Sequence, residues 1–144
     1  MIFWDSSAIV PLALVEERSE EVGAVLRQDP DMIVWWAAPV EVLSALARAE
    51  RAHAIAPADV DLARRALEDL LDRWNELLPS DEVRDRAGAA VLRHPLRVAD
   101  ALQLGAALTW ARGRPRAHRL LSLDGRLASA ARQEGFDVVT LSEA

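Results

Sequence analysis

The sequence predicts an α/β fold in which a short parallel sheet lies between layers of helices. Two observations predict it: apolar runs of strand length alternate with longer segments, and apolar residues recur in those segments at helical spacing. The chain has 144 residues and is 51% hydrophobic, which suits one domain with a real core, residues 1–144. We find no internal repeat, low-complexity tract or linker.

The first half of the chain predicts two strands and four helices. The opening apolar run ends at Asp5, and Ser6 can cap the helix that follows. Pro39 and Pro57 suit helix starts, where a missing N–H costs little. The expected strands cover residues 1–4 and 32–36, and the expected helices cover residues 7–14, 19–27, 39–51 and 58–75. Strand alternation predicts that one of Trp35 and Trp36 is buried and the other exposed.

The second half predicts three further strands and three helices. Ser80 can cap a helix that ends before Pro95, and Gly113 closes the next helix. The expected strands cover residues 76–78, 118–123 and 136–140, and the expected helices cover residues 80–93, 98–110 and 124–133. Strands that alternate with helices in this way imply a parallel sheet.

Composition and charge exclude several classes of protein. The chain has no cysteine, which excludes disulfides, thiolate metal sites and cysteine nucleophiles and fits a reducing cytoplasm. No apolar stretch is long enough to span a bilayer, and we expect neither an export signal nor a membrane partner. The net charge of −6 argues against a protein that simply coats nucleic acid. It remains compatible with a nuclease, because bound cations reverse the local sign.

Four acidic residues interrupt apolar runs, unlike the acids of the solvated helix faces. Asp5 and Asp124 each follow an expected strand, while Glu41 and Asp100 lie near the starts of expected helices. Ligands of open α/β sheets bind beyond the carboxyl ends of the strands, so all four acids can face one edge of the sheet. Taken alone, Asp124 also fits a helix N-cap, Asp100 a first-turn acid and Glu41 a solvated helix residue. The place of Asp5 in the first strand-to-helix turn already favours a function. The combination of four is what favours a functional site.

Electrostatics then predicts a bound cation. Two carboxylates about 5 Å apart repel by roughly 3 kcal/mol at an effective dielectric near 20, and four repel several-fold more. Mg²⁺ prefers carboxylate oxygens and often bridges to substrate phosphates, with Mn²⁺ as an expected substitute. The three histidines show no spacing typical of metal ligands. We therefore expect a metal-dependent hydrolase that acts on phosphodiester bonds.

The four acidic segments resemble those of PIN-domain ribonucleases, most closely the VapC-type toxins of type II toxin–antitoxin pairs. The resemblance runs nearly end to end and is carried by residues 2–10, 40–48, 96–108 and 120–128, in this order and at these separations. It implies a three-layer PIN-like fold, a magnesium site, RNA hydrolysis, a homodimer and an antitoxin that blocks the site. Carried over by position, the catalytic and metal-binding residues are Asp5, Glu41, Asp100 and Asp124.

Two hydroxyl groups and one glycine complete the resemblance. Ser7 and Ser122 match positions beside the site, where a hydroxyl can orient a carboxylate or a water; both also fit helix-end or turn roles. Ser122 stands where the family usually has Thr. Gly105 replaces the usual Ala, and helix propensity alone predicts a helix loosened by about 1 kcal/mol.

A basic cluster lies just before Asp124, in the loop that leads into the strand expected at residues 118–123 and at the start of that strand. Its members are Arg112, Arg114, Arg116, His118 and Arg119. They can contact an RNA backbone, and they equally fit a solvated loop.

Two other functions remain open. A non-catalytic RNA- or protein-binding module on the same fold would keep the shape and lose acids, and here all four are present. A phospho-aspartate protein also places an acid after a strand. However, response-regulator receivers need a lysine near the phosphate, and this chain has no lysine. Aspartate-nucleophile phosphatases have a second aspartate two positions after the first, and that position after Asp5 is Ser7.

Overall fold

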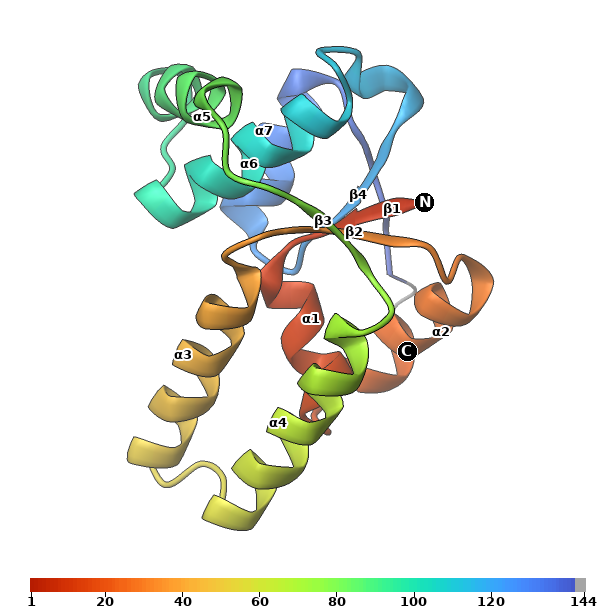
Figure 1. Cartoon of the computed structure of the whole chain (residues 1–144), viewed down its shortest axis with the longest axis vertical. Coiled ribbons are helices and arrows are strands. Elements are labelled where there is room, and N and C mark those ends of the chain that lie inside the picture. Colours follow the sequence, from red (N-terminus) through yellow and green to blue (C-terminus); the bar gives the residue numbers. More distant parts are fainter. Residues whose placement is uncertain (142–144) are drawn as a thin grey trace.

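The computed structural model describes residues 1–141 as a five-stranded sheet between two helical layers (Figure 1). The expected single domain covers residues 1–144, so its last three residues lie outside the described part. The strands are β1 (Ile2–Trp4), β2 (Met32–Trp35), β3 (Asn75–Leu77), β4 (Arg119–Leu121) and β5 (Asp137–Val138). The helices are α1 (Ser6–Ala13), α2 (Ser19–Gln28), α3 (Ala38–Arg51), α4 (Pro57–Leu71), α5 (Asp81–Arg93), α6 (Val98–Trp110) and α7 (Gly125–Glu134), with the 3₁₀ turn η1 (Pro115–Ala117). Within this range no helix has the length and apolar character needed to cross a bilayer.

The order of the strands fixes the place where a ligand can bind. All neighbouring strands are parallel, in the order β3-β2-β1-β4-β5. The connections from β1 to β3 run through α1–α4 on one face, and α5–α7 cover the other face (Figure 1). The order reverses between β1 and β4, where Trp4 pairs with Leu121. Such a switch point opens a crevice at the carboxyl ends of the two strands. The structure confirms the three-layer α/β fold.

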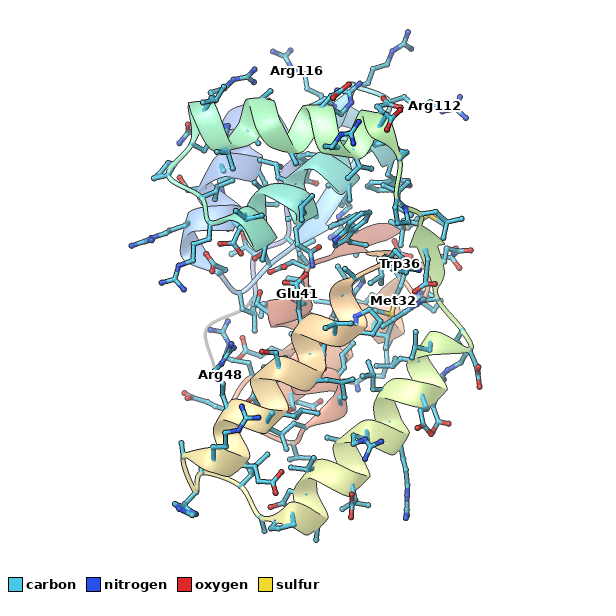
Figure 2. The ribbon with its side chains drawn as sticks, turned by 60° about the vertical axis from the view of Figure 1, so that its left-hand side comes forward. Met32, Trp36, Glu41, Arg48, Arg112 and Arg116 are labelled. Carbon is cyan, nitrogen blue, oxygen red and sulfur yellow. The ribbon has the colours of Figure 1, made fainter. Side chains whose placement is uncertain are left out.

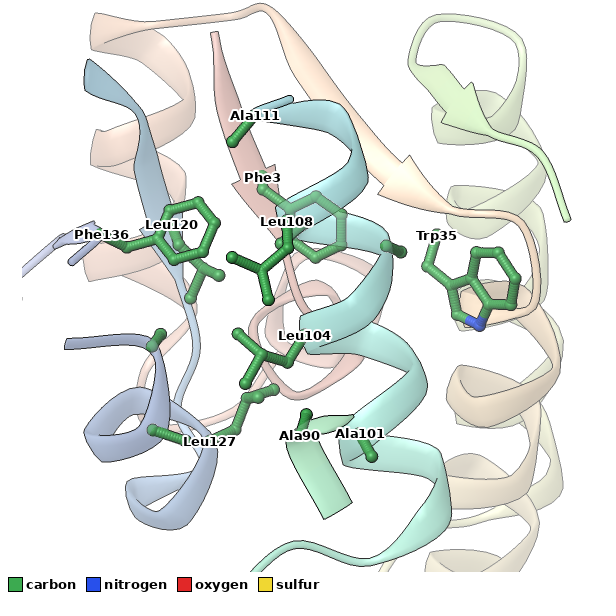
Figure 3. Packing of buried hydrophobic residues seen from close by; sticks show 14 of the residues in the cluster. Phe3, Trp35, Ala90, Ala101, Leu104, Leu108, Ala111, Leu120, Leu127 and Phe136 are labelled. Carbon is green, nitrogen blue, oxygen red and sulfur yellow. The ribbon is translucent and has the colours of Figure 1, made fainter. Parts of the chain in front are cut away.

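Two apolar cores hold the layers together. Successive strand residues point to opposite faces, so Phe3 joins the core under α5–α7 while Ile2 and Trp4 join the core over α1–α4. Figure 3 shows Phe3 packed among residues of α6, β4 and α7. The expectation for the tryptophan pair is confirmed, since Trp35 is 6% exposed and Trp36 is 53% exposed.

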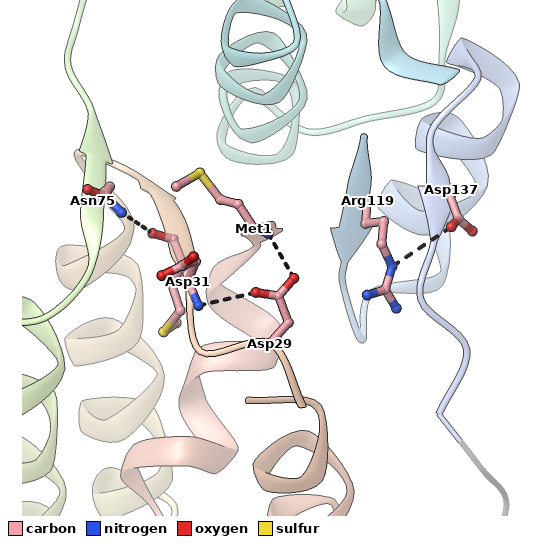
Figure 4. Close-up of polar contacts among 7 residues, drawn as sticks. Met1, Asp29, Asp31, Asn75, Arg119 and Asp137 are labelled. Carbon is pink, nitrogen blue, oxygen red and sulfur yellow. Dashed lines mark hydrogen bonds and ion pairs between the residues drawn. The ribbon is translucent and has the colours of Figure 1, made fainter. Parts of the chain in front are cut away.

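The third strand corrects one expected boundary. Helix α4 ends at Leu71 and not near residue 75, because the chain must leave the helix to bring Trp74 into the core and Asn75 into the sheet. The Asn75 side chain donates to the backbone oxygen of Met32 at 3.1 Å (Figure 4). Strands β4 and β5 are shorter than expected, and the shorter β4 leaves Ser122 outside the sheet.

Gly105 is a packing requirement and not a weak point in its helix. An added Cβ would lie 2.8 Å from both the Val83 oxygen and the Ala87 nitrogen of α5. These are backbone atoms, so they cannot move aside without shifting a helix. The missing side chain lets α5 and α6 approach closely, which is a reason for glycine at this position that helix propensity does not reveal.

We therefore predict opposite effects for two helical glycines. Gly105→Ala should destabilise the protein by about 1–3 kcal/mol through overpacking. Gly88→Ala, on the exposed face of α5 with nothing within 4 Å of the added Cβ, should stabilise it by about 0.5–1 kcal/mol. Urea unfolding measures both. A Gly105→Ala protein as stable as Gly88→Ala would contradict the close packing of α5 and α6.

Candidate active site

Asp5 is the buried centre of the acidic group. It follows β1, is 2% exposed, and its backbone N–H donates to the Leu121 oxygen across the switch point. Its carboxylate accepts hydrogen bonds from Ser7 and, at 2.8 Å, from Ser122. Burial raises the pKa of Asp5, the hydroxyl bonds oppose that rise, and the charge of Asp124 adds to it. This carboxylate is therefore held where its charged form lacks a positive partner.

The two serines tie the β1–α1 turn to the β4–α7 turn. Ser7 accepts a hydrogen bond from the Leu123 N–H at 2.9 Å, and Ser122 accepts one from the Asp124 N–H at 3.1 Å. Both hydroxyls are thereby aimed at Asp5. The sequence left open whether Ser7 and Ser122 orient a carboxylate or only end a helix or turn. In the structure each donates a hydrogen bond to the Asp5 carboxylate.

Glu41 reaches the same place from the first turn of α3. The Ser6 hydroxyl donates to its Oε2 and the Gln103 amide donates to its Oε1, each at 3.0 Å. Burial, with smaller contributions from the charges of Asp5 and Asp100, raises the pKa of Glu41 to about 7. The structure thus brings carboxylates from β1, α3 and α6 into one electrostatic group.

Asp100 and Asp124 complete the group in different ways. Asp100 is the third residue of α6, and burial with the charges of Asp124 and Asp5 raises its pKa. Asp124 is the N-cap of α7 and accepts from the N–H groups of Arg126 and Leu127 at 2.9 and 3.1 Å through Oδ1. Asp124 therefore caps α7, as one alternative from the sequence held, and the cap occupies Oδ1.

An open pocket of about 890 Å³ collects these groups at the carboxyl edge of the sheet. Glu41 and Arg48 both line the pocket, and Figure 2 shows Arg48 further along α3 than Glu41. The lining includes Asp5, Glu41, Asp100, Asp124, Ser6, Ser7, Arg48, Arg97 and Arg126. The pocket is thus lined by both carboxylates and arginines.

Sequence reasoning missed four residues of the site: Ser6, Arg97 and Arg126, which line the pocket, and Gln103, which donates to Glu41. Two of them stand beside predicted acids in the chain, Arg97 three residues before Asp100 and Arg126 two residues after Asp124. Gln103 is fully buried in an otherwise apolar run and lies one helical turn from Asp100. A polar residue at that spacing was a usable signal, because buried amides need a partner.

The donor set fits a hard divalent cation. The pocket offers carboxylate and hydroxyl oxygens, and burial raises the pKa values of three of its acids, Asp5, Glu41 and Asp100. Within residues 1–141, however, no three acidic or histidine side chains are close enough together to form a ready metal site. Hydrogen bonds from Ser6 and Gln103 hold the Glu41 carboxylate, and one from Ser122 holds that of Asp5.

The basic cluster predicted from sequence lies away from the acids. Helix α6 begins beside Asp100 and ends at Trp110, about 20 Å along its axis. Arg112 and Arg116 lie at the top of the view in Figure 2, away from Glu41, which lies near the middle of the molecule. Arg114 belongs to the same loop, and Arg119 faces Asp137 at 3.8 Å in the sheet (Figure 4).

The fold and pocket define a parallel α/β protein with acids gathered at its switch point. No protein-family model matches the chain, and no curated protein matches it. Solved structures do. It is similar to a toxin–antitoxin complex from Klebsiella pneumoniae (20% identity, all of both chains, TM-score 0.64). It is also similar to VapC20 of Mycobacterium tuberculosis, described as a sarcin–ricin loop cleaving toxin (15% identity, 90% of this chain and 95% of that one, TM-score 0.67).

A third match extends the same pattern. VapBC2 from Rickettsia felis, solved bound to a DNA fragment from its promoter, has 11% identity over 99% of this chain and 100% of that one, with a TM-score of 0.68. Matches of this kind confirm the PIN-like, VapC-type fold expected from the sequence.

The raised pKa of Glu41 predicts a pH-dependent stability. In the unfolded chain this carboxyl loses its proton near its ordinary value of 4.5, whereas the folded protein keeps it until about pH 7. Its contribution to stability is thus full below pH 4.5 and lost as pH rises through 7. Glu41→Gln stays neutral at every pH. The melting temperature of this variant minus that of the unsubstituted protein, measured in EDTA, should therefore increase between pH 4.5 and 8. Glu68→Gln, an exposed substitution on α4, is the control. An equal response of the two variants would contradict the burial of Glu41.

Proposed function

We propose that this protein is a divalent-cation-dependent endoribonuclease that hydrolyses RNA phosphodiester bonds. The observation that carries the proposal is the buried Asp5 carboxylate, placed with three other acids in an open pocket at the switch point. The VapC-type fold supports it, because one protein of that fold is described as cleaving the sarcin–ricin loop.

The residues divide the work according to their surroundings. Asp5 and Asp100 are the first candidates to bind Mg²⁺ or Mn²⁺, since burial and a neighbouring negative charge disfavour the charged form of both carboxyls. Glu41 binds the ion or accepts a proton from the attacking water, for which a carboxyl with a pKa near 7 is suited. Asp124 keeps one oxygen for a second ion or a water. Bound divalent cations supply an activated water and stabilise charge on the leaving oxygen.

The arginines that line the pocket can bind the phosphates of a substrate beside the acids. Arg48, Arg97 and Arg126 line the same space as the four carboxylates and are exposed. An arginine fork binds phosphate oxygens, so these side chains can hold the RNA backbone beside the carboxylates.

The biological role we propose is that of a toxin controlled by a cognate antitoxin. Two of the matched structures are toxin–antitoxin assemblies that share this fold. We also propose a homodimer and a cytoplasmic location, in keeping with the family resemblance and the absence of cysteine. Light scattering on the purified protein tests the dimer. Co-purification with the product of a neighbouring gene tests the antitoxin.

Replacing the central acids should separate activity from stability. Mutating even a residue that only hydrogen-bonds to a metal ligand lowers activity or metal affinity by about 10–100-fold. Asp5→Asn and Asp100→Asn should therefore lower RNA cleavage in Mg²⁺ by more than about a hundredfold. Their melting temperatures should stay equal or rise, since repulsion is relieved. Asp61→Asn, an exposed acid on α4, should change neither. Full activity in Asp5→Asn would overturn the assignment.

Calorimetric titration distinguishes the enzyme from a non-catalytic binding module. We expect saturable binding of Mn²⁺ to the unsubstituted protein and its loss in Asp5→Asn. A binding module would give no heat that depends on Asp5.

A further inference from the structure

Positive charge is concentrated in one stretch of this acidic chain. Residues 111–135 contain six arginines and two acids, whereas the whole chain has 17 arginines and 23 acids. Both acids of the stretch are already engaged. Asp124 caps α7, and Glu134 is paired with Arg93 and His94 at 2.7 and 2.8 Å. The stretch therefore presents a basic surface on a molecule that is negative elsewhere.

Helix α7 connects the acidic pocket to the basic loop before β4. Its first turn carries Arg126, which lines the pocket. Its other end is Gly135, where an added Cβ would lie 3.4 and 3.5 Å from Pro115 and Arg116. The helix has 10 residues and so spans about 15 Å.

The exposed face of α7 is polar and carries no acid. Arg126, Ser129, Arg132 and Gln133 are all exposed, and Gln133 donates to Ser129 at 3.4 Å along the same face. We call this face, together with the loop residues Arg112, Arg114 and Arg116, the basic track. It joins the pocket to the loop before β4, and the exposed acid Asp137, just beyond the end of α7, faces Arg119 at 3.8 Å.

The loop end of the track offers a stacking site beside its arginines. A second pocket, of about 360 Å³, is lined by Trp110, Arg112, Arg114 and His118, together with Ala111. The Trp110 and His118 rings meet edge to face with centroids 4.7 Å apart. Aromatic walls with arginines beside them suit nucleobases and phosphates, and bind them with little regard to sequence.

The three loop arginines are available for such a ligand. In the part of the chain that the structure describes, none of Arg112, Arg114 and Arg116 forms an ion pair. Arg112 also has a left-handed backbone, with φ of 52°, which is uncommon for a residue with a side chain.

We propose that the basic track binds the RNA substrate beyond the cleavage site, so that the preferred substrate is a long or folded RNA and not a short oligonucleotide. At 3.4 Å per stacked nucleotide, the 15 Å of α7 corresponds to about four or five nucleotides between the cleaved bond and the loop. An RNA fits this track better than an acidic protein does, because a pocket with aromatic walls lies beside the arginines of the loop. The inference rests on the proposed function for the location of the cleaved bond.

The test compares RNA length in two arginine triples. The track variant is Arg112→Gly with Arg114→Ala and Arg116→Ala; glycine keeps the positive φ of position 112 unstrained. The control is Arg51→Ala with Arg64→Ala and Arg65→Ala, which removes three exposed charges from the α3–α4 side. Labelled random-sequence RNAs of about 30 and about four nucleotides report binding by anisotropy, and cleavage is followed in Mg²⁺. Circular dichroism verifies that both variants are folded.

The track variant should bind the long RNA at least about tenfold more weakly, with a salt slope shallower by about 2, as three lost phosphate contacts predict. Binding and cleavage of the short RNA should not change, and the control should match the unsubstituted protein. A second substitution, Arg132→Glu, should weaken only the long RNA, whereas Arg65→Glu should not.

Two results would overturn the track. One is equal weakening by both triples, which would mean a general charge effect. The other is undiminished long-RNA binding in the track variant, which would leave the loop to a protein partner or to solvent. If the unsubstituted protein cuts neither RNA, the proposed function fails, and the binding comparison still decides the track.

Discussion

The Asp5 carboxylate is buried at the centre of the candidate site with no positively charged side chain of residues 1–141 bonded to it, and the rest of the site is arranged around it. Asp5 is 2% exposed, and the groups that hold it are hydroxyls with no full charge to offset its own. Three further acids line the same pocket, and the charge of Asp124 adds to the cost of ionising Asp5. A surface ion pair would have been a cheaper arrangement for stability alone. The arrangement is understandable if the site is built to receive positive charge from a bound cation.

Sheet topology makes this convergence possible. Asp5 and Asp124 follow neighbouring parallel strands at the switch point, so the register of Trp4 with Leu121 brings the two turns together. Helices α3 and α6 then approach from opposite faces of the sheet and carry Glu41 and Asp100 to the same edge. The close crossing of α5 over α6 at Gly105 helps to fix where α6 begins. Packing far from the pocket therefore sets the geometry of the acids.

Much of this was predictable from the sequence, for specific reasons. The four acids stood out because they interrupt apolar runs, and the α/β alternation was visible because the strands are continuous apolar segments. The end of α4 and the role of Gly105 were not predictable, since both depend on contacts with distant segments. Ser6 and Gln103 were missed because their partner, Glu41, is remote in the chain. The separation of the Arg112–Arg116 loop from the acids also required the length and direction of α6.

The most direct test of the central claim is a crystal structure of the protein soaked with Mn²⁺, with anomalous data collected to locate the ion. The account predicts a peak about 2.2 Å from a carboxylate oxygen of Asp5, with Asp100, Glu41 or Asp124 as a further ligand. It also predicts that the acids move inward relative to the present arrangement. The absence of a peak in this pocket, or a peak only at surface acids, would contradict it.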